Sequence, residues 1–266
     1  MLSSARIRRR KAMGKMPLVV HAWDIPRKTQ EDTDFLKHAG AEGMGSKAGL
    51  TALLAGTVGT SVMEMSRTAG APSIHDAKIC DLRDQVLGAV RIIVALKVTG
   101  FTARLSEEMS PQTLREIVAE RNRSYEQMLS RAEPHKSGER PLERPIIFGV
   151  TELSSISIRR AEFEARLLRN AEMMGNVGFD GAVVPAGFLE PLKTRFPALK
   201  TLVVGVRPFP EARIWRDDQR YPLTHLEAAA LGGDILVIGR PISTAEDRHA
   251  AVSRIMGDLR AQAART

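Results

Sequence analysis

Short apolar runs rich in β-forming residues alternate along this chain with longer stretches of helical periodicity. The apolar runs predict eight strands, at residues 18–24, 43–47, 73–78, 91–98, 145–151, 181–184, 200–205 and 234–238. The periodic stretches predict helices at residues 29–39, 49–69, 82–90, 110–132, 157–177, 186–196, 224–231 and 243–263. Such alternation is typical of an α/β protein with a parallel sheet, and eight strands favour a closed (β/α)8 TIM barrel.

The second strand is predicted mainly from its position between helices, because Glu42-Gly-Met-Gly-Ser-Lys47 has little β propensity. The same segment is similar to a phosphate-binding loop, but its two glycines stand too close together. In addition, Ala48 occupies the place of the Ser or Thr that such loops use for magnesium. A nucleoside triphosphate site is therefore not expected.

Composition favours one globular domain over residues 17–266, preceded by a basic extension at residues 1–16. The chain has 266 residues and is 43% hydrophobic, which is enough for a single large core. Its formal charge of +8 is concentrated in that extension, which holds six Lys and Arg residues and no acid. The rest of the chain is left at +2, so neither nucleic acid nor a membrane surface is an expected partner of the barrel.

The extension is Arg-rich, contains serines and superficially resembles an organelle-targeting segment. Met13 and Met16 follow it, and either is a candidate natural start, so we expect a disordered or mis-started extension. Targeting and loose anion binding remain open alternatives. No run of about 18 apolar residues follows, so no membrane span is expected. Cys80 is the single cysteine, which excludes an intramolecular disulfide and favours the cytoplasm.

A cluster of charges, Asp76-Ala-Lys78-Ile-Cys-Asp81, stands at the end of the third predicted strand. Because side chains alternate along a strand, Asp76 and Lys78 should point the same way, with Asp81 in the following loop. A structural ion pair at a strand end and a catalytic charge cluster both fit this pattern. Further residues are needed to decide between them.

Further polar residues follow other predicted strands, where a barrel carries its chemistry. They are Asp24, Lys47, Ser154-Ser155, Gly205-Val-Arg207-Pro208, Asp217-Asp-Gln219-Arg220 and Gly239-Arg240. In this order and spacing they resemble the orotidine 5'-phosphate decarboxylase family, from about Leu18 to about Arg260. The Asp-x-Lys-x-x-Asp element is shared with sugar-phosphate relatives, whereas the later elements point to the nucleotide decarboxylase.

The resemblance implies decarboxylation of orotidine 5'-monophosphate to uridine 5'-monophosphate, without metal or organic cofactor. Lys78 would stabilise the developing carbanion and protonate it. Asp76 would lie beside the substrate carboxylate. Lys47 and Asp81 would complete an alternating array of charges that holds Lys78 protonated and aimed. In the family the counterpart of Asp81 reaches the neighbouring subunit's site, which implies a homodimer.

The resemblance also assigns substrate contacts away from the bond that breaks. Arg240, with Gly239, and Gln219 would hold the phosphate, and residues 207–220, including Arg207, would form a loop over the substrate. Ser155 would hydrogen-bond the pyrimidine. Asp24 and Lys47 would hold ribose hydroxyls.

Two departures from the family pattern concern the ribose side and the dimer contacts. Leu82-Arg-Asp-Gln85 replaces an Ile-Pro-x-Thr run, so Gln85 stands where a threonine would contact substrate. Near the fourth strand, Val98-Thr-Gly-Phe-Thr102 replaces a His-x-x-Gly-Gly-like run.

Two other functions stay open at this point. One is a sugar-phosphate decarboxylase or aldolase of the same superfamily, which would hold magnesium with the shared acidic residues. The other is a non-catalytic barrel that binds phosphorylated ligands or, through its basic extension, nucleic acid.

Overall fold

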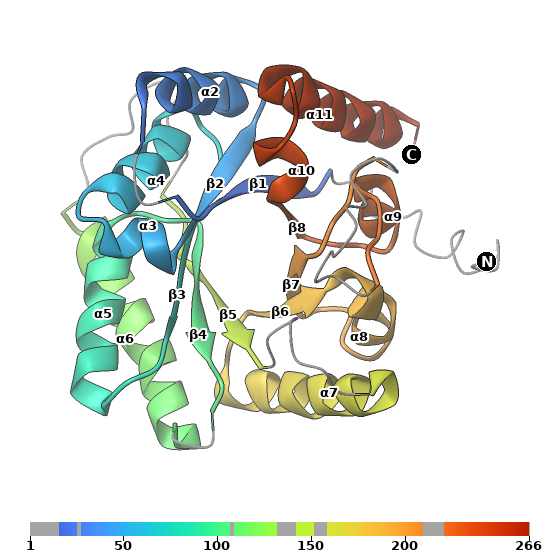
Figure 1. Cartoon of the computed structure of the whole chain (residues 1–266). Coiled ribbons are helices and arrows are strands. Elements are labelled where there is room, and N and C mark those ends of the chain that lie inside the picture. Colours follow the sequence, from blue (N-terminus) through green and yellow to red (C-terminus); the bar gives the residue numbers. More distant parts are fainter. Residues whose placement is uncertain are drawn as a thin grey trace.

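The computed structural model describes residues 16–25, 28–106, 109–131, 142–151, 159–209 and 221–265. Eight parallel strands close into a barrel in chain order (Figure 1). They are β1 Leu18–Trp23, β2 Met44–Gly49, β3 Ser73–Ile79, β4 Gly100–Arg104, β5 Ile146–Val150, β6 Gly181–Pro185, β7 Lys200–Val204 and β8 Ile235–Ile238. The predicted fold class is confirmed. The predicted basic extension lies outside the described residues, apart from Met16.

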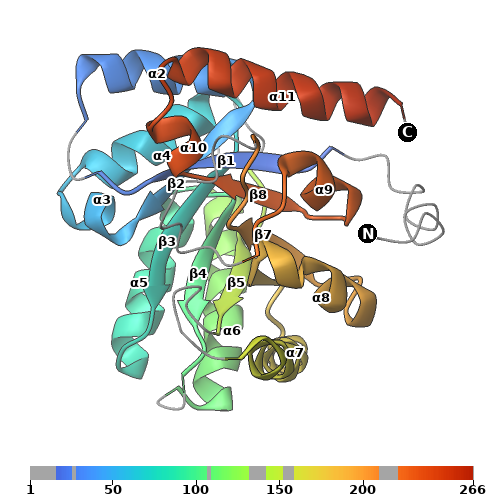
Figure 2. The ribbon, with the colours of Figure 1, turned by 45° about the vertical axis from the view of Figure 1, so that its right-hand side comes forward.

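Helices surround the barrel, and α11 lies beside α2 along one side of it (Figure 2). The helical elements are α2 Gln30–Ala41, α3 Leu50–Leu54, α4 Val58–Thr68, α5 Arg83–Ala95, α6 Pro111–Leu129, α7 Arg160–Val177, η1 Ala186–Phe188, α8 Leu189–Arg195, α9 His225–Ala230, α10 Arg240–Ser243 and α11 Arg248–Ala264. Across the described ranges, none of these helices combines the length and the apolar character needed to cross a bilayer.

The strand predicted at residues 91–98 is wrong, because most of this segment is the second half of α5. Val86, Val90 and Ile93 are buried at helical spacing, whereas Ile92 is 66% exposed. Neighbouring β-branched residues thus face opposite sides of a helix instead of filling a buried strand. The true fourth strand is the short β4, which follows immediately.

Two predicted helices are each divided in the structure. The segment 49–69 forms α3 and α4, which are separated by a turn at Gly56 with a φ of +64°. The helix predicted at residues 243–263 begins earlier, at Arg240. Its first part is the single turn α10, and the rest of it is α11.

The barrel interior is filled by apolar side chains from β1, β3, β5, β7 and β8, with Phe148 on β5 as the largest. Gly100 on β4 and Gly181 on β6 flank it. A Cβ atom at either glycine would lie 2.9 Å or less from the Phe148 ring. Two glycines therefore make room for one aromatic ring, and the barrel is packed below its mouth.

The segment of low β propensity does form β2, and all six of its residues are buried. A Cβ atom at Gly45 would lie 1.6 Å from the carbonyl oxygen of Pro72, and that oxygen accepts the Ser46 N–H at 3.0 Å. Close approach of two backbones, instead of side-chain propensity, explains the glycine in this strand.

Two buried cations hold the opposite, N-terminal rim of the barrel. Asp180 precedes β6 and accepts hydrogen bonds from Arg121 at 2.6 Å and from the Ile147 N–H at 2.9 Å. Asp234 precedes β8 and accepts bonds from Lys193 at 2.6 Å and from the Thr201 N–H at 2.9 Å. Each carboxylate thus ties a strand start to a helix, at the end of the barrel away from the loops that follow the strands.

Candidate active site

Three of the predicted charges meet at the mouth of the barrel. Lys47 on β2 places its Nζ 2.5 Å from Asp76 Oδ2, and Lys78 on β3 places its Nζ 3.0 Å from Asp76 Oδ1. The register pairs Gly49 with Asp76, so both strands present these residues at their C-terminal ends. One carboxylate therefore holds two ammonium groups, and we call Lys47, Asp76 and Lys78 the charge triad.

Burial differs within the charge triad. The side chains of Lys47 and Asp76 are each 9% exposed, while that of Lys78 is 36% exposed. Burial alone would raise the pKa of Asp76, but the charges of Lys47 and Lys78 outweigh it and hold that pKa below its usual value. Asp76 is therefore ionised at neutral pH, and Lys78 is the member of the triad that a ligand can reach.

The backbone at Lys78 is unusual for a strand. Its φ is +51°, a left-handed value that non-glycine residues seldom adopt, and the β3–β4 register shifts between His75 and Ile79. Such strain persists where the surroundings fix it, which is common at functional sites.

Thr102 on β4 supports this conformation. Its hydroxyl oxygen accepts the Lys78 N–H at 2.9 Å and donates to Asp76 Oδ1 at 2.9 Å. Sequence reasoning missed this role because it misplaced the fourth strand. A correct β4 would have put Thr102 on the inward face, two residues after Gly100.

Asp81, the predicted fourth charge, stands apart from the triad in this single chain. It is exposed, and its Oδ1 accepts the N–H of Leu82 at 2.6 Å. Among the ion pairs of the described residues, none joins Asp81 to Lys78.

Two other predicted regions lie at the same end of the barrel. Asp24 directly follows β1 and contacts Gly49, where a Cβ atom would lie 1.8 Å from its Oδ1. Gly239 follows β8, the other neighbour of β1, and a Cβ atom there would lie 3.3 Å from the Cβ of Ala22. Arg240 comes next and is half-buried at the start of α10.

The remaining predicted residues are more scattered or lie outside the described ranges. Arg207 is 5% exposed, its N–H donates to the Leu223 carbonyl at 2.8 Å, and its guanidinium donates to the Val206 carbonyl at 3.1 Å. Gln85 is exposed on α5. Ser155 and Gln219 lie outside the described residues, as does most of the predicted loop 207–220.

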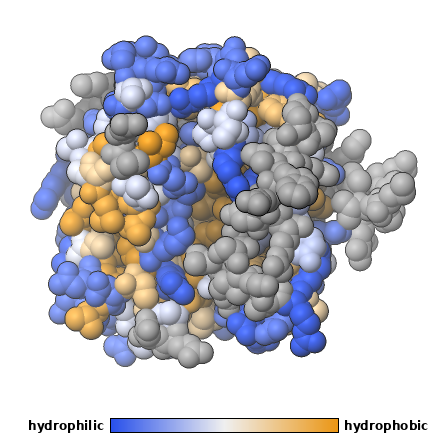
Figure 3. Space-filling view, viewed as in Figure 1, coloured by the Kyte–Doolittle hydropathy of each residue, from blue (hydrophilic) through white to orange (hydrophobic). Residues whose placement is uncertain are grey.

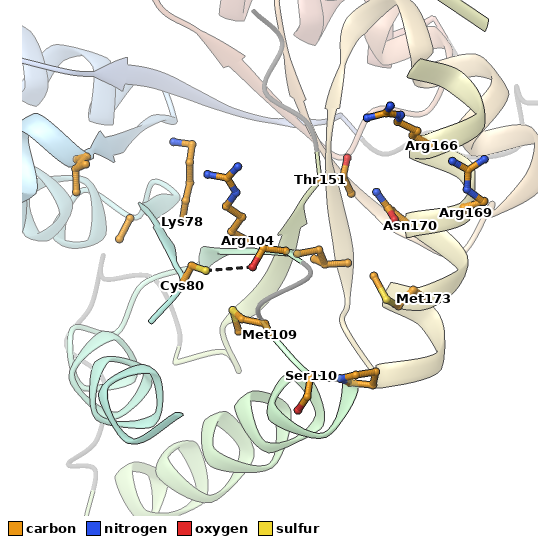
Figure 4. A pocket seen from close by; sticks show the side chains of 15 residues that line it. Lys78, Cys80, Arg104, Met109, Ser110, Thr151, Arg166, Arg169, Asn170 and Met173 are labelled. Carbon is orange, nitrogen blue, oxygen red and sulfur yellow. Dashed lines mark hydrogen bonds between the residues drawn. The ribbon is translucent and has the colours of Figure 1, made fainter. Parts of the chain in front are cut away.

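A cavity of about 1340 Å³ opens beside Lys78 (Figure 4). Cys80, Arg104 and Thr151 line it near the strand ends, and Arg169 and Asn170 line it from α7. Lys78 and Arg104 both project into this space (Figure 4). The arrangement can bind an anionic ligand with a reacting atom close to the Lys78 ammonium.

The described residues offer no group of three or more His, Cys, Asp or Glu side chains placed to hold a metal ion.

Comparison with a family model decides the relationship. The model described as "Orotidine 5'-phosphate decarboxylase / HUMPS family" matches residues 17–255. The chain belongs to this family. The predicted resemblance is thereby confirmed at the level of the family, over most of the chain.

Curated relatives match a shorter part. Orotidine 5'-phosphate decarboxylases of Pseudomonas syringae and Pseudomonas aeruginosa are 36% and 37% identical over 123 residues. Each match spans 44% of this chain and 52% of the relative, so the chain aligns with about half the length of these proteins.

Solved structures support the fold. A Lactobacillus acidophilus orotidine 5'-phosphate decarboxylase has a TM-score of 0.68 at 20% identity, covering 92% of this chain and 99% of the other. The Methanocaldococcus jannaschii enzyme, solved with the inhibitor BMP, has a TM-score of 0.65 at 14% identity over the same shares.

Proposed function

We propose that this protein decarboxylates orotidine 5'-monophosphate to uridine 5'-monophosphate. The observation that carries the proposal is the charge triad at the barrel mouth, in a chain that belongs to the decarboxylase family. Lys78 is its accessible ammonium and Asp76 is its ionised, buried partner.

Lys78 supplies the chemistry in this proposal. The bond between the ring carbon and the carboxylate breaks, its electron pair stays on the ring carbon, and carbon dioxide leaves. Lys78 Nζ faces that pair and then donates the proton that replaces the carboxylate. One charge pair at about 4 Å is worth roughly 4 kcal/mol at an effective dielectric near 20. Because enzymes commonly lower barriers by more than this, other contacts must contribute.

Substrate binding away from the reacting carbon contributes to the part of the barrier lowering that Lys78 alone does not provide. Arg240 and Gly239 stand at the end of β8, where they would hold the phosphate together with Gln219. Asp24 and Lys47 would hold ribose hydroxyls, and Ser155 the pyrimidine. Gln85 and Arg207 complete the proposed binding residues. Gln85 is exposed, whereas Arg207 is buried and its guanidinium donates to the Val206 carbonyl.

A homodimer is the proposed active form, with Asp81 reaching the partner's site. Two observations support it. Asp81 is exposed, and among the described residues its carboxylate makes no ion pair with Lys78 of its own chain. Apolar side chains also gather on this face over α3 and α5 (Figure 3). Leu50 and Leu54 of α3 are 54% and 77% exposed, and Leu82, which directly precedes α5, is 78% exposed. Contiguous exposed apolar surface of this kind marks protein contacts.

The proposed reaction is the last step of pyrimidine nucleotide synthesis, and we infer a cytoplasmic setting. Cys80, the single cysteine, is a free thiol, as a reducing compartment permits.

The test is an absorbance assay of orotidine monophosphate turnover with the wild type, Lys78→Ala and Arg240→Ala. We expect near-complete loss of turnover for Lys78→Ala and mainly a raised KM for Arg240→Ala. Lys97→Ala is the matched control, because Lys97 is exposed, also has a positive φ, and lies between α5 and β4 at the other end of the barrel. Full activity of Lys78→Ala would end the proposed mechanism.

The same assay separates the alternatives. Turnover of a sugar phosphate that is abolished by a chelator would favour a magnesium-dependent relative. Absence of any turnover, with salt-sensitive nucleic-acid binding that is lost on deleting residues 1–16, would favour a non-catalytic binding protein.

A further inference from the structure

We propose that Arg104 is a specificity-determining residue that binds the carboxylate of the substrate. The inference rests on the proposed function and deepens it. With Arg104 on β4 and Arg240 after β8, the site would hold the two acidic groups of its ligand on opposite sides of the barrel mouth.

The position of Arg104 follows from strand alternation. Arg104 is the last residue of β4, and it shares the inward face with Gly100 and Thr102. Thr102 reaches Asp76 from that face, with 2.9 Å between the two oxygens. One step further toward the mouth, Arg104 enters the cavity that Lys78 also lines, and the two side chains point the same way in the close-up view (Figure 4).

Arg104 has no hydrogen-bond or ion-pair partner within the described part of the chain, and it is exposed. Two arginines elsewhere in the molecule are held by carboxylates. Arg121 binds Asp180 at 2.6 Å, and Arg248 binds Asp32 at 2.9 Å. A guanidinium that is left open toward a cavity presents a planar fork of donors, which matches a carboxylate in bidentate geometry.

The spacing of cations around the mouth fits a ligand with two separate acidic groups. In the closed order β1 to β8, strands β4 and β8 are four strands apart and therefore stand opposite each other. Orotidine monophosphate carries two separate acidic groups, the 5'-phosphate and the ring carboxylate, with the ribose between them. If the phosphate lies at Arg240, the carboxylate points toward β3 and β4, where the Asp76 carboxylate is close and Lys78 faces the reacting carbon. Arg104 supplies the compensating charge.

This role has a kinetic signature that differs from that of Lys78. The carboxylate leaves as neutral carbon dioxide, so its contact with Arg104 is strong in the ground state and weakens in the transition state. Such an interaction lowers KM without raising kcat. Uridine monophosphate has no carboxylate, so its binding should not depend on Arg104.

The experiment measures kcat and KM for orotidine monophosphate and the inhibition constant of uridine monophosphate in the wild type, Arg104→Gln and Arg104→Lys. We expect Arg104→Gln to raise KM by about tenfold, with kcat unchanged or higher, and to leave uridine monophosphate inhibition unchanged. Arg104→Lys should recover part of the loss in KM. Dissociation constants measured in a Lys78→Ala background, where turnover is blocked, should show the same selectivity.

Two controls keep the proposal open to refutation. Arg195→Gln removes an exposed cation at the end of α8, outside the residues that line this cavity, and should leave KM unchanged. Glu107 and Glu108 lie outside the described residues, so a Glu107→Gln/Glu108→Gln variant tests them as partners of Arg104 and should keep its affinity for orotidine monophosphate.

Several results would overturn the assignment. They are an equal loss of affinity for both nucleotides in Arg104→Gln, a fall in kcat at unchanged KM, an effect of Arg195→Gln as large as that of Arg104→Gln, or a change of affinity in the double Glu variant. Turnover of orotidine monophosphate by the wild type tests the proposed function separately. An active wild type with an Arg104→Gln variant of unchanged KM would refute this inference alone.

Discussion

The Thr102 hydroxyl oxygen accepts the backbone N–H of Lys78 at 2.9 Å, across the point where the β3–β4 register shifts. The same hydroxyl donates to Asp76, so one side chain fixes both the carboxylate and the strained backbone of the candidate acid. Thr102→Val keeps the shape but removes both bonds. We expect kcat to fall about tenfold, on the order of 1–2 kcal/mol, with little change in KM.

Thr102→Ser is the matched control, because it keeps the hydroxyl and removes only a methyl group. Steady-state kinetics on both variants check the prediction. Equal kcat values for the Val and Ser variants would show that Thr102 packs against the triad without positioning it.

Lys47 is expected to set the acid limb of the pH–rate profile. It is one of the two cations that lower the pKa of Asp76, so Lys47→Met should raise that pKa. As pH falls, Asp76 would then be protonated at a higher pH than in the wild type, and activity would be lost earlier. We expect the acid limb of log kcat to move upward in pH and the plateau to drop by about 100-fold.

Lys193→Met provides the comparison for Lys47→Met. Lys193 is another buried lysine paired with an aspartate, 2.6 Å from Asp234, but at the opposite rim of the barrel. Its replacement should lower the thermal midpoint and leave the acid limb in place. If both variants shift the limb alike, then the effect comes from general destabilisation.

Much of the barrel could be predicted from sequence, because buried strands and amphipathic helices alternate with distinct periods. The fourth strand failed for a physical reason. Ile92, Ile93 and Val94 are β-branched and adjacent, and only their unequal burial reveals a helix. The true strand, Gly100–Arg104, is short and begins with a glycine. That glycine has no side chain and so leaves space for the Phe148 ring.

The candidate site was predictable where chemistry is concentrated in one strand. Asp76 and Lys78 share a face by alternation, and Lys47 joins them through the neighbouring strand. Thr102 and Arg104 were not recognised, because their roles depend on which residues of β4 point inward. A single threonine or arginine is not part of a recognisable sequence motif. Only the position of β4 in the barrel and its register with the neighbouring strands show which groups these side chains face.

Gly100 allows the packing at the base of the barrel to be measured. A Cβ atom there would lie 2.8 Å from the Ile146 carbonyl oxygen and 2.9 Å from the Phe148 ring. Because a backbone atom is one of the two neighbours, the clash cannot be relieved by a side chain alone. Gly100→Ala should lower the free energy of unfolding by about 1–3 kcal/mol.

Gly175→Ala is the control for Gly100→Ala. Gly175 lies within α7, with nothing within 4 Å of an added Cβ atom, so the change should stabilise by roughly 0.5–1 kcal/mol. Urea titrations of both variants give the comparison. A stable Gly100→Ala protein would contradict the close packing around Phe148.

His21 should make the protein sensitive to mild acid. It lies on β1, fully buried, with its ring edge-on to Phe35 at 5.4 Å, and neither ring nitrogen has a hydrogen-bond partner among the described residues. Burial, followed by the nearby charges of Arg248 and Lys47, lowers its pKa to about 3. The unfolded chain binds this proton near pH 6.5, whereas the folded chain binds it near pH 3.

The sign of the effect follows from that difference. Below pH 6.5 His21 is protonated in the unfolded state but stays neutral in the folded state. The free energy of unfolding therefore has its full value above pH 6.5 and falls as the pH drops toward 3. The total loss is on the order of a few kcal/mol. His21→Leu removes the group that titrates, and its stability should depend less on pH across this window. Chemical denaturation at a series of pH values checks this, with His249→Leu, at an exposed histidine beside Phe35, as the control. Parallel pH profiles for wild type and His21→Leu would show that His21 is protonated at similar pH in both states, against the burial described here.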